Sequence, residues 1–176
     1  MNSIIVQTIG FIALFFVLFS FQKNKRSKIL AIMLIGLALF VIHFGLLGAW
    51  TGALMNLIET GVVFVAYKKE TEPWAAKKFW PYLFIFIYSV VGFLVAKHLV
   101  DILPVIAQIF GTIAVWQTNP RTIRFIMLVP RPLWFFYNMI VGSYGGMATE
   151  VFILLSLVVG ILRFDILSQK KIEKGV

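Results

Sequence analysis

Cysteine is absent from the 176-residue chain, and histidine occurs only twice, at His43 and His98. Without thiols the chain can form neither a disulfide framework nor a thiolate metal site. The two histidines lie far apart in the sequence, so they do not indicate a metal site either. We therefore expect no metal and no cofactor.

Charged side chains are also scarce. They make up 13% of the residues, about half the share of an ordinary globular domain, whereas hydrophobic residues make up 61%. The mean hydropathy is +0.96, and no acidic or Ser/Gly-rich run leaves room for a soluble domain. This composition predicts an integral membrane protein with the lipid bilayer as a partner.

In a soluble chain the net charge of +9 would suggest nucleic-acid binding. Here the basic residues lie in short loops between apolar runs, where they face an anionic leaflet and set the topology. We therefore expect no nucleic-acid partner. The first apolar run, 1–20, has no basic residue before it and no small-residue cleavage site, so we interpret it as a retained span rather than a signal peptide.

Seven apolar runs are long enough to cross a bilayer as helices, for which about 20 mostly apolar residues are needed. Several of them are apolar on all sides, which excludes the alternating pattern of a membrane β-barrel. The fifth run is short and contains Asp101, Pro104 and Gln108. The predicted spans are 3–22, 29–47, 50–67, 79–97, 101–117, 121–141 and 144–163.

Lysine and arginine indicate how these spans are oriented. Four segments carry most of them, and seven spans put all four segments on one side of the membrane, with only Lys97 on the other. The positive-inside rule then predicts the N-terminus outside and the C-terminus inside. The four segments contain Lys23, Lys25, Arg26 and Lys28; Lys68, Lys69, Lys77 and Lys78; Arg121 and Arg124; and Arg163, Lys170, Lys171 and Lys174.

The second half of the chain repeats the first. An offset of 95 pairs Gln22 with Gln117 and Arg26 with Arg121. After a one-residue deletion, an offset of 94 gives the pairs Leu39/Leu133, Phe40/Trp134, His43/Tyr137, Gly48/Gly142, Ala49/Ser143, Trp50/Tyr144, Gly52/Gly146 and Asn56/Glu150.

Three-helix units cross a membrane an odd number of times, so two parallel units need one extra crossing between them. We therefore predict an all-α membrane protein of seven helices in a 3+1+3 arrangement. Its parts are a first triple-helix unit at 1–67, a cytoplasmic loop and linker helix at 68–98, a second unit at 99–165 and a basic cytoplasmic tail at 166–176.

This arrangement resembles the SWEET, semi-SWEET and PQ-loop transporters, which are built from parallel repeats. The segments 116–124, 132–138 and 142–146, together with Glu150, look more closely like the YgjV-type family of bacterial inner-membrane proteins. That resemblance covers almost the whole chain. It implies a multi-pass protein of the bacterial inner membrane with a seven-helix SWEET-like fold. The Pro-Gln dipeptide of the PQ-loop proteins is absent, because Gln22 follows Phe21 and Gln117 follows Trp116.

Polar residues inside the predicted spans are the candidate solute-binding residues. A charge at the centre of a membrane helix costs about 2.5–3.5 kcal/mol on insertion scales, so it persists where it is paired or faces a polar cavity. Two interpretations fit: a central pocket between the two units, or a structural ion pair of Arg131 with Glu150 or Glu59. The residues at comparable depth are Arg131, Glu150, Asn56, Glu59 and Gln108.

Pro130 and Pro132 flank Arg131 in the sixth predicted span. A proline removes a backbone donor and disrupts the preceding helical turn. The disruption could act as a hinge between the two units, or it could only shape the helix to its neighbours. The first unit has Gly36 near the equivalent position and no proline, so any hinge is asymmetric.

Trp134, Tyr137, Asn138 and His43 are expected to cluster near the outer third of two helices. Rings and an amide of this kind suit a sugar, a nucleoside or an aromatic vitamin. Anchoring at the lipid interface is the competing explanation for Trp and Tyr, and a helix–helix hydrogen bond is the competing explanation for histidine. A lipid-facing amide is costly, which favours an inward direction for Asn138.

No nucleophile with a base partner and no phosphate-binding loop occurs, so we do not expect an enzyme. The leading hypothesis is a transporter or facilitator of a small polar solute that works by rocking two triple-helix units around a central site. The alternatives are a membrane scaffold or regulator that does not transport, and a vitamin or nucleoside permease similar to the PnuC proteins. The chain could act as a monomer or a homodimer.

Overall fold

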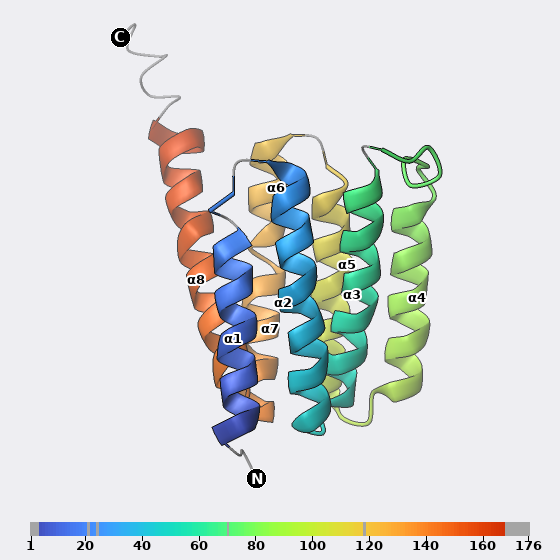
Figure 1. The fold of residues 1–176 in the computed structure, drawn as a ribbon, viewed down its shortest axis with the longest axis vertical. Coiled ribbons are helices and arrows are strands. Elements are labelled where there is room, and N and C mark those ends of the chain that lie inside the picture. The colour runs from blue at the N-terminus through green and yellow to red at the C-terminus, as the bar shows by residue number, and fades with distance from the viewer. Residues whose placement is uncertain (1–3, 21, 24, 70, 118, 168–176) are drawn as a thin grey trace, which may run out of the picture.

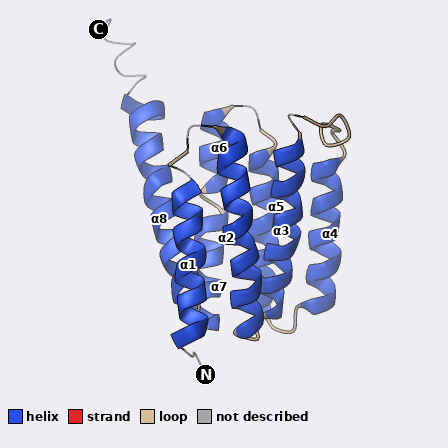
Figure 2. Ribbon diagram, in the orientation of Figure 1, coloured by secondary structure: helices blue, strands red, loops and turns tan. Residues whose placement is uncertain are grey.

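The computed structural model describes residues 4–20, 22–23, 25–69, 71–117 and 119–167. Helices account for nearly all of this part of the chain, and no strand occurs in it (Figure 2). Most of the predicted basic tail, from residue 168 onward, lies outside the described residues.

Each predicted span corresponds to helical structure, with ends that differ by a few residues. The helices are α1 (Ile4–Ser20), α2 (Arg26–Leu46), α3 (Trp50–Lys68), α4 (Trp80–Val95), α5 (Ile102–Val115) after the 3-10 turn η1 (Leu99–Asp101), α6 (Pro120–Met127), α7 (Pro130–Val141) and α8 (Tyr144–Gly160), which continues as the wider turns of η2 (Ile161–Leu167). Three helical stretches are long and apolar enough to cross a membrane: Ser27–Leu46, Trp50–Lys68 and Tyr144–Ile166. Shorter apolar helices cover Ile4–Ser20, Trp80–Val95 and Leu99–Val115.

The sixth predicted span, 121–141, is not one continuous helix. It is divided between Met127, where α6 ends, and Pro130, where α7 begins. Pro130 has no N–H to donate to the carbonyl one turn earlier, and the N–H of Val129 instead bonds the Ile126 carbonyl at 3.0 Å in a tighter turn. The helix is thus interrupted directly before Arg131, as the prolines predict, and the hinge role of Pro130 and Pro132 stays a prediction.

Two glycines end helices with the same backbone geometry. Gly48 after α2 and Gly142 after α7 have φ values of +73° and +72°, in the left-handed region that glycine adopts without strain. The N–H groups of Ala49 and Ser143 bond back to the carbonyls of Phe44 and Asn138, at 2.9 and 2.8 Å. The paired positions 48 and 142 of the sequence repeat thus make matching turns.

The contacts between helices form a ring with one helix outside it, and Figure 1 shows that helix, α4, at one edge of the bundle. α2 packs between α1 and α3, and α7 packs between α5 and α8. The ring closes where α1 meets α8 and where α3 meets α5, while α4 packs on the outside against α3 and α5. The α1–α8 contact is close, because a Cβ added to Gly145 would lie 2.5 Å from the Gly10 carbonyl carbon.

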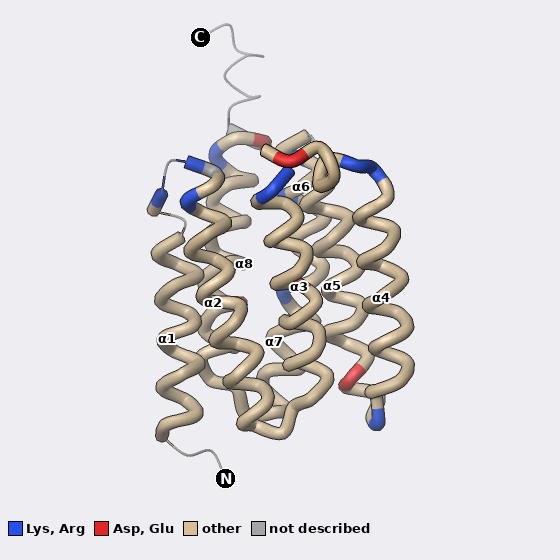
Figure 3. Tube along the Cα trace, turned by 45° about the vertical axis from the view of Figure 1, so that its right-hand side comes forward, with Lys and Arg blue, Asp and Glu red and all other residues tan. Residues whose placement is uncertain are grey.

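Charge divides the two ends of the bundle. Basic residues gather at the end where η2 finishes, which we call the charged end (Figure 3). α1 begins at the opposite end (Figure 1), where the α4–α5 connection carries Lys97 and Asp101. The first described helix therefore begins at one end of the bundle, and the last described element finishes at the other end.

Candidate functional site

A cavity of about 460 Å³ lies inside the ring, and it is the candidate site. Its volume is in the range of small-molecule pockets. Side chains from α1, α2, α3, α5, α6, α7 and α8 line it. Seven of the nine residues predicted to bind solute are among them: Asn56, Glu59, Gln108, Arg131, Trp134, Asn138 and Glu150.

Arg131 and Glu150 form an ion pair in the wall of the cavity. Arg131 Nη1 donates to Glu150 Oε2 at 3.0 Å, and the two side chains are only 15% and 10% exposed. Arg131 Nε is buried without a hydrogen-bond partner in the described part of the chain. The pair and the cavity thus occur together, so the two sequence interpretations do not exclude each other.

Glu59 has a different partner from Glu150. Its Oε2 accepts a hydrogen bond of 2.7 Å from the hydroxyl of Tyr88, a fully buried residue of α4. No ion pair of Glu59 occurs among the described residues, although the Arg131 guanidinium attracts its carboxylate at longer range. The cavity therefore holds one carboxylate with a cationic partner and one with a neutral partner.

Three amides line the cavity, those of Asn56, Gln108 and Asn138. Asn56 Nδ2 donates to the Gly52 carbonyl at 2.9 Å, within its own helix. Asn138 is 1% exposed, and its Oδ1 is buried without a hydrogen-bond partner in the described residues. Gly146 makes room for this amide, because a Cβ there would lie 2.7 Å from Asn138 Oδ1. The acceptor Oδ1 of Asn138 is thus unpaired among the described residues, in a buried position between α7 and α8.

Trp134 lines the cavity beside two phenylalanines. Its ring centroid lies 5.9 Å from that of Phe44, which lies 6.0 Å from that of Phe40, and all three residues line the cavity. Trp134 is 6% exposed and Tyr137 is fully buried. The competing explanation that these two rings anchor the protein at the lipid interface is therefore wrong.

Tyr137 and His43 do not line the cavity, and each is engaged in a contact between helices. The Tyr137 hydroxyl accepts a hydrogen bond of 2.8 Å from the Gly52 N–H. His43 Nδ1 lies 2.8 Å from the Val6 carbonyl and Nε2 lies 2.8 Å from Ser143 Oγ. Because a carbonyl only accepts, Nδ1 is the donor of the first contact.

These contacts belong to a polar cluster at the end of the bundle opposite the charged end. Gln7 joins it, since its Nε2 donates to the Gly142 carbonyl at 2.8 Å and its Oε1 accepts from the Tyr144 N–H at 3.2 Å. The cluster ties α1, α2, α3, α7 and α8 together. We call it the neutral plug: Gln7, His43, Gly52, Tyr137, Gly142, Ser143 and Tyr144.

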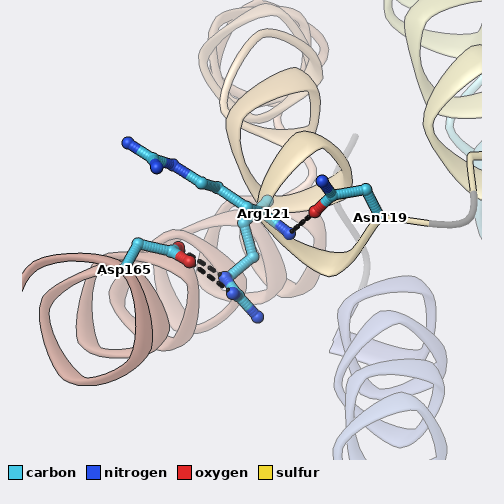
Figure 4. A network of polar contacts seen from close by, with 4 residues as sticks. Asn119, Arg121 and Asp165 are labelled. Carbon is cyan, nitrogen blue, oxygen red and sulfur yellow. Dashed lines mark hydrogen bonds and ion pairs between the residues drawn. The ribbon is translucent and has the colours of Figure 1, made fainter. Parts of the chain in front are cut away.

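The cavity extends from the neutral plug toward the charged end. Asn138 and Gly146 line it next to the plug, and Leu30, Ala66 and Val115 line it near the charged ends of their helices. There Arg124 of α6 binds Asp165 of η2 through two hydrogen bonds of 2.8 and 2.7 Å (Figure 4). The two ends of the bundle thus carry different contacts, neutral hydrogen bonds at one end and an ion pair at the other.

Sequence reasoning missed two partners of the charged residues. Tyr88 lies at mid-length of α4, at a depth similar to Glu59, and a phenol in the middle of an apolar span was a usable signal. Asp165 was also a usable signal, as a lone carboxylate near the end of an apolar run. Their partners lie on other helices, so no sequence spacing identifies them.

The residues that the structure describes contain no group of three or more His, Asp or Glu side chains that could hold a metal. The polar side chains of the cavity wall are Asn56, Glu59, Gln108, Arg131, Asn138, Thr149 and Glu150. The only hydroxyl among them, that of Thr149, donates to the Gly145 carbonyl and not to a base. The geometry suits binding of a small molecule through hydrogen bonds, charge and ring faces.

Comparison with known proteins finds a family of bacterial inner membrane proteins. A family model described as a bacterial inner membrane protein, Imp-YgjV, matches residues 4–167. The inner membrane protein YgjV of Escherichia coli (strain K12) is 26% identical over 172 residues, which cover 96% of this chain and 89% of that protein. No solved structure matches the chain significantly.

Proposed function

The chain belongs to the Imp-YgjV family of bacterial inner membrane proteins, and from this premise we propose that it transports a small polar solute through the central cavity. The observation that carries the proposal is the convergence of polar groups from both halves of the chain on one cavity. Free hydrogen-bonding capacity remains there, at Asn138 Oδ1 and Arg131 Nε. Buried polar groups without partners are costly, and a bound solute would satisfy them.

We propose that the helices form two parallel triple-helix units, α1–α3 and α5–α8, joined by α4. Residues that are 94 positions apart in the sequence support this arrangement, because they line the cavity from both sides. Seven such pairs occur: Met33/Met127, Leu37/Arg131, Phe40/Trp134, Phe44/Asn138, Asn56/Glu150, Glu59/Ile153 and Val63/Leu157.

The contacts between the units support the same arrangement. The first helix of one unit meets the last helix of the other at both closures of the ring, α1 with α8 and α5 with α3. A two-fold axis along the cavity relates one contact to the other. We propose an orientation with the N-terminus outside and the charged end inside, as the positive-inside rule requires. The fold is then of the SWEET-like type.

In this orientation the neutral plug is the outer gate, and the Arg124–Asp165 contact lies at the inner end. Transport requires that each end opens while the other stays closed. The break between α6 and α7 allows the inner part of the second unit to move without disturbing the Arg131–Glu150 pair. Loss of the hydrogen bonds of the plug would open the outer end.

The test is solute flux in vesicles that contain the purified full-length chain. A panel of labelled sugars, vitamins, amino acids and amines is offered, with Phe93→Ala as the control, since Phe93 is 86% exposed on α4. We expect uptake of at least one solute class, unchanged in the control and lost in Asn138→Ala. Absence of flux for every class, with Arg131→Ala and Glu150→Gln harmless to cells, would instead favour a scaffold or regulator.

A further inference from the structure

The cavity wall holds more acidic than basic side chains. Its lining includes two carboxylates, Glu59 and Glu150, and one guanidinium, Arg131. Arg131 is bonded to Glu150 at 3.0 Å, and the partner of Glu59 is the neutral hydroxyl of Tyr88. One guanidinium offsets only one of the two carboxylates, so the ionised wall has a net charge of −1.

A buried charge without an opposite charge is unfavourable, because the low-dielectric interior does not replace its hydration. A bound cation would offset the charge of Glu59. The buried Asn138 Oδ1 is a free acceptor for an N–H or O–H group of the same molecule. The free Arg131 Nε–H is a donor for a hydroxyl or carbonyl oxygen.

The aromatic part of the lining suits the same class of ligand. Trp134, Phe44 and Phe40 form a run of rings whose neighbouring centroids are 5.9 and 6.0 Å apart. Ring faces attract organic cations, and clusters of such rings recognise ammonium groups in particular. An inorganic cation would gain little from these rings, because it would have to give up its water for carbon atoms.

We propose that the solute of this cavity is a small organic monocation, with an ammonium group and a hydrogen-bonding oxygen. The statement that this ligand is transported rests on the proposed function. The ligand class is assigned from the cavity alone. Glu59 supplies the balancing charge, the three rings contact the organic cation, and Asn138 and Arg131 bind its polar groups. The charges of Arg131 and Glu150 offset each other in their ion pair.

The binding test uses the full-length chain in detergent and measures thermal stabilisation and calorimetric affinity. The probes are methylammonium, choline, benzyltrimethylammonium and 3,3-dimethyl-1-butanol, the last being the neutral isostere of choline. We expect saturable binding of at least one cation, and choline should bind about tenfold or more tightly than its neutral isostere, as charge and ring contacts predict. Equal binding of choline and its isostere, or binding of none of the cations, would overturn the proposal.

Variants of the cavity residues test whether Glu59 is responsible for cation binding. Glu59→Gln should lower the cation affinity about tenfold and leave the neutral isostere unchanged, whereas Glu72→Gln, the same change in the loop before α4, should alter neither. Glu59→Asp should recover part of the affinity. Circular dichroism and gel filtration establish that each variant is folded, and a folded Glu59→Gln protein with unchanged cation affinity would contradict the assignment.

Vesicle uptake separates this inference from the proposed function. If cations bind as expected but none is taken up, the ligand class stands and transport fails. If neutral solutes are taken up and cations are not, transport stands and the ligand class fails. Uptake of a cation that is lost in Glu59→Gln supports both.

Discussion

The two halves of the ring face one cavity but bring different chemistry to it. At paired positions, α2 has Leu37 where α7 has Arg131, and α3 has Asn56 where α8 has Glu150. Glu59 is the carboxylate of the first half, and Ile153 occupies the corresponding position of the second half. Glu59 accepts its hydrogen bond from the neutral hydroxyl of Tyr88 on α4. A shared backbone plan thus carries an asymmetric set of charges.

In the proposed two-unit arrangement, this difference explains why the units belong to one chain. A pair of identical units would duplicate every charge, so the cavity between them would hold an even number of carboxylates and guanidiniums. One guanidinium with two carboxylates requires two different units. The helix break is likewise confined to one unit, between α6 and α7, whereas α2 is continuous from Arg26 to Leu46.

The largest effect is expected when the charged pair of the second half is broken. Arg131→Leu, which copies Leu37, leaves Glu150 buried without its cation and should cost about 3–5 kcal/mol of stability. The double variant Arg131→Leu/Glu150→Asn copies both residues of the first half and should recover most of that loss. Denaturant titration in detergent measures both variants, and a double variant as unstable as the single one would contradict the pairing.

The same two variants distinguish a structural pair from a functional one. If the pair only fastens helices, the stable double variant keeps its solute flux. If it belongs to the binding wall, the double variant is folded and has lost flux. We expect the second result.

The next effect concerns the contact between the halves at α1 and α8. Gly145→Ala adds a Cβ that would lie 2.5 Å from the Gly10 carbonyl carbon, and because backbone cannot yield as a side chain can, we expect a loss of about 1–3 kcal/mol. Gly45→Ala is the control, since a Cβ at Gly45 has no neighbour within 4 Å. Thermal unfolding of the two proteins gives the comparison, and equal melting temperatures would show that the α1–α8 contact adapts.

A smaller effect is expected from the turns before α3 and α8. Ser143 and Ala49 occupy the same N-cap position in the two halves, but only Ser143 accepts a hydrogen bond, from Gly146 N–H at 3.2 Å. Ser143→Ala should cost about 1–2 kcal/mol, and Ala49→Ser should stabilise by about 0.5–1 kcal/mol. Unfolding measurements on both variants test this. Opposite signs are expected, and a loss in both would mean that the turns are not equivalent.

The smallest effect is expected at the Arg124–Asp165 contact, which has no counterpart in the first half, where Leu30 and Thr71 occupy the paired positions. Asp165→Asn should lower the melting temperature slightly at low salt. The difference should shrink as salt is added, because ions screen charges that solvent can reach and the Arg124 side chain is 21% exposed. A difference that does not change between low and high salt would show that the contact is not acting as an ion pair. Glu72→Gln, in an exposed loop, serves as the control.

Much of the fold could be predicted from the sequence, because it depends on local patterns. Apolar runs identify the helices, and Gly48 and Gly142 identify the turns that the structure shows. The polar residues could be predicted to converge because charge and amides are costly against lipid. Seven of the nine line one cavity.

The remaining features depend on contacts between distant helices. Tyr137 and His43 are polar and aromatic in the same pattern as Trp134, yet they point into the neutral plug behind the cavity wall. The Tyr88 contact with Glu59 depends on how α4 packs against α3. No periodicity within a single helix determines which neighbour a side chain meets, so these roles required the packed structure.

The close approach of Gly10 and Gly145 has a mechanical consequence. Of the two places where the ring closes, the α1–α8 contact brings backbone against backbone, with no side chain between them to change rotamer. We expect such a contact to act as the pivot of a movement between the two halves. We therefore expect any movement between the two halves to keep α1 against α8 and to widen the other closure, between α3 and α5, against which α4 packs from the outside.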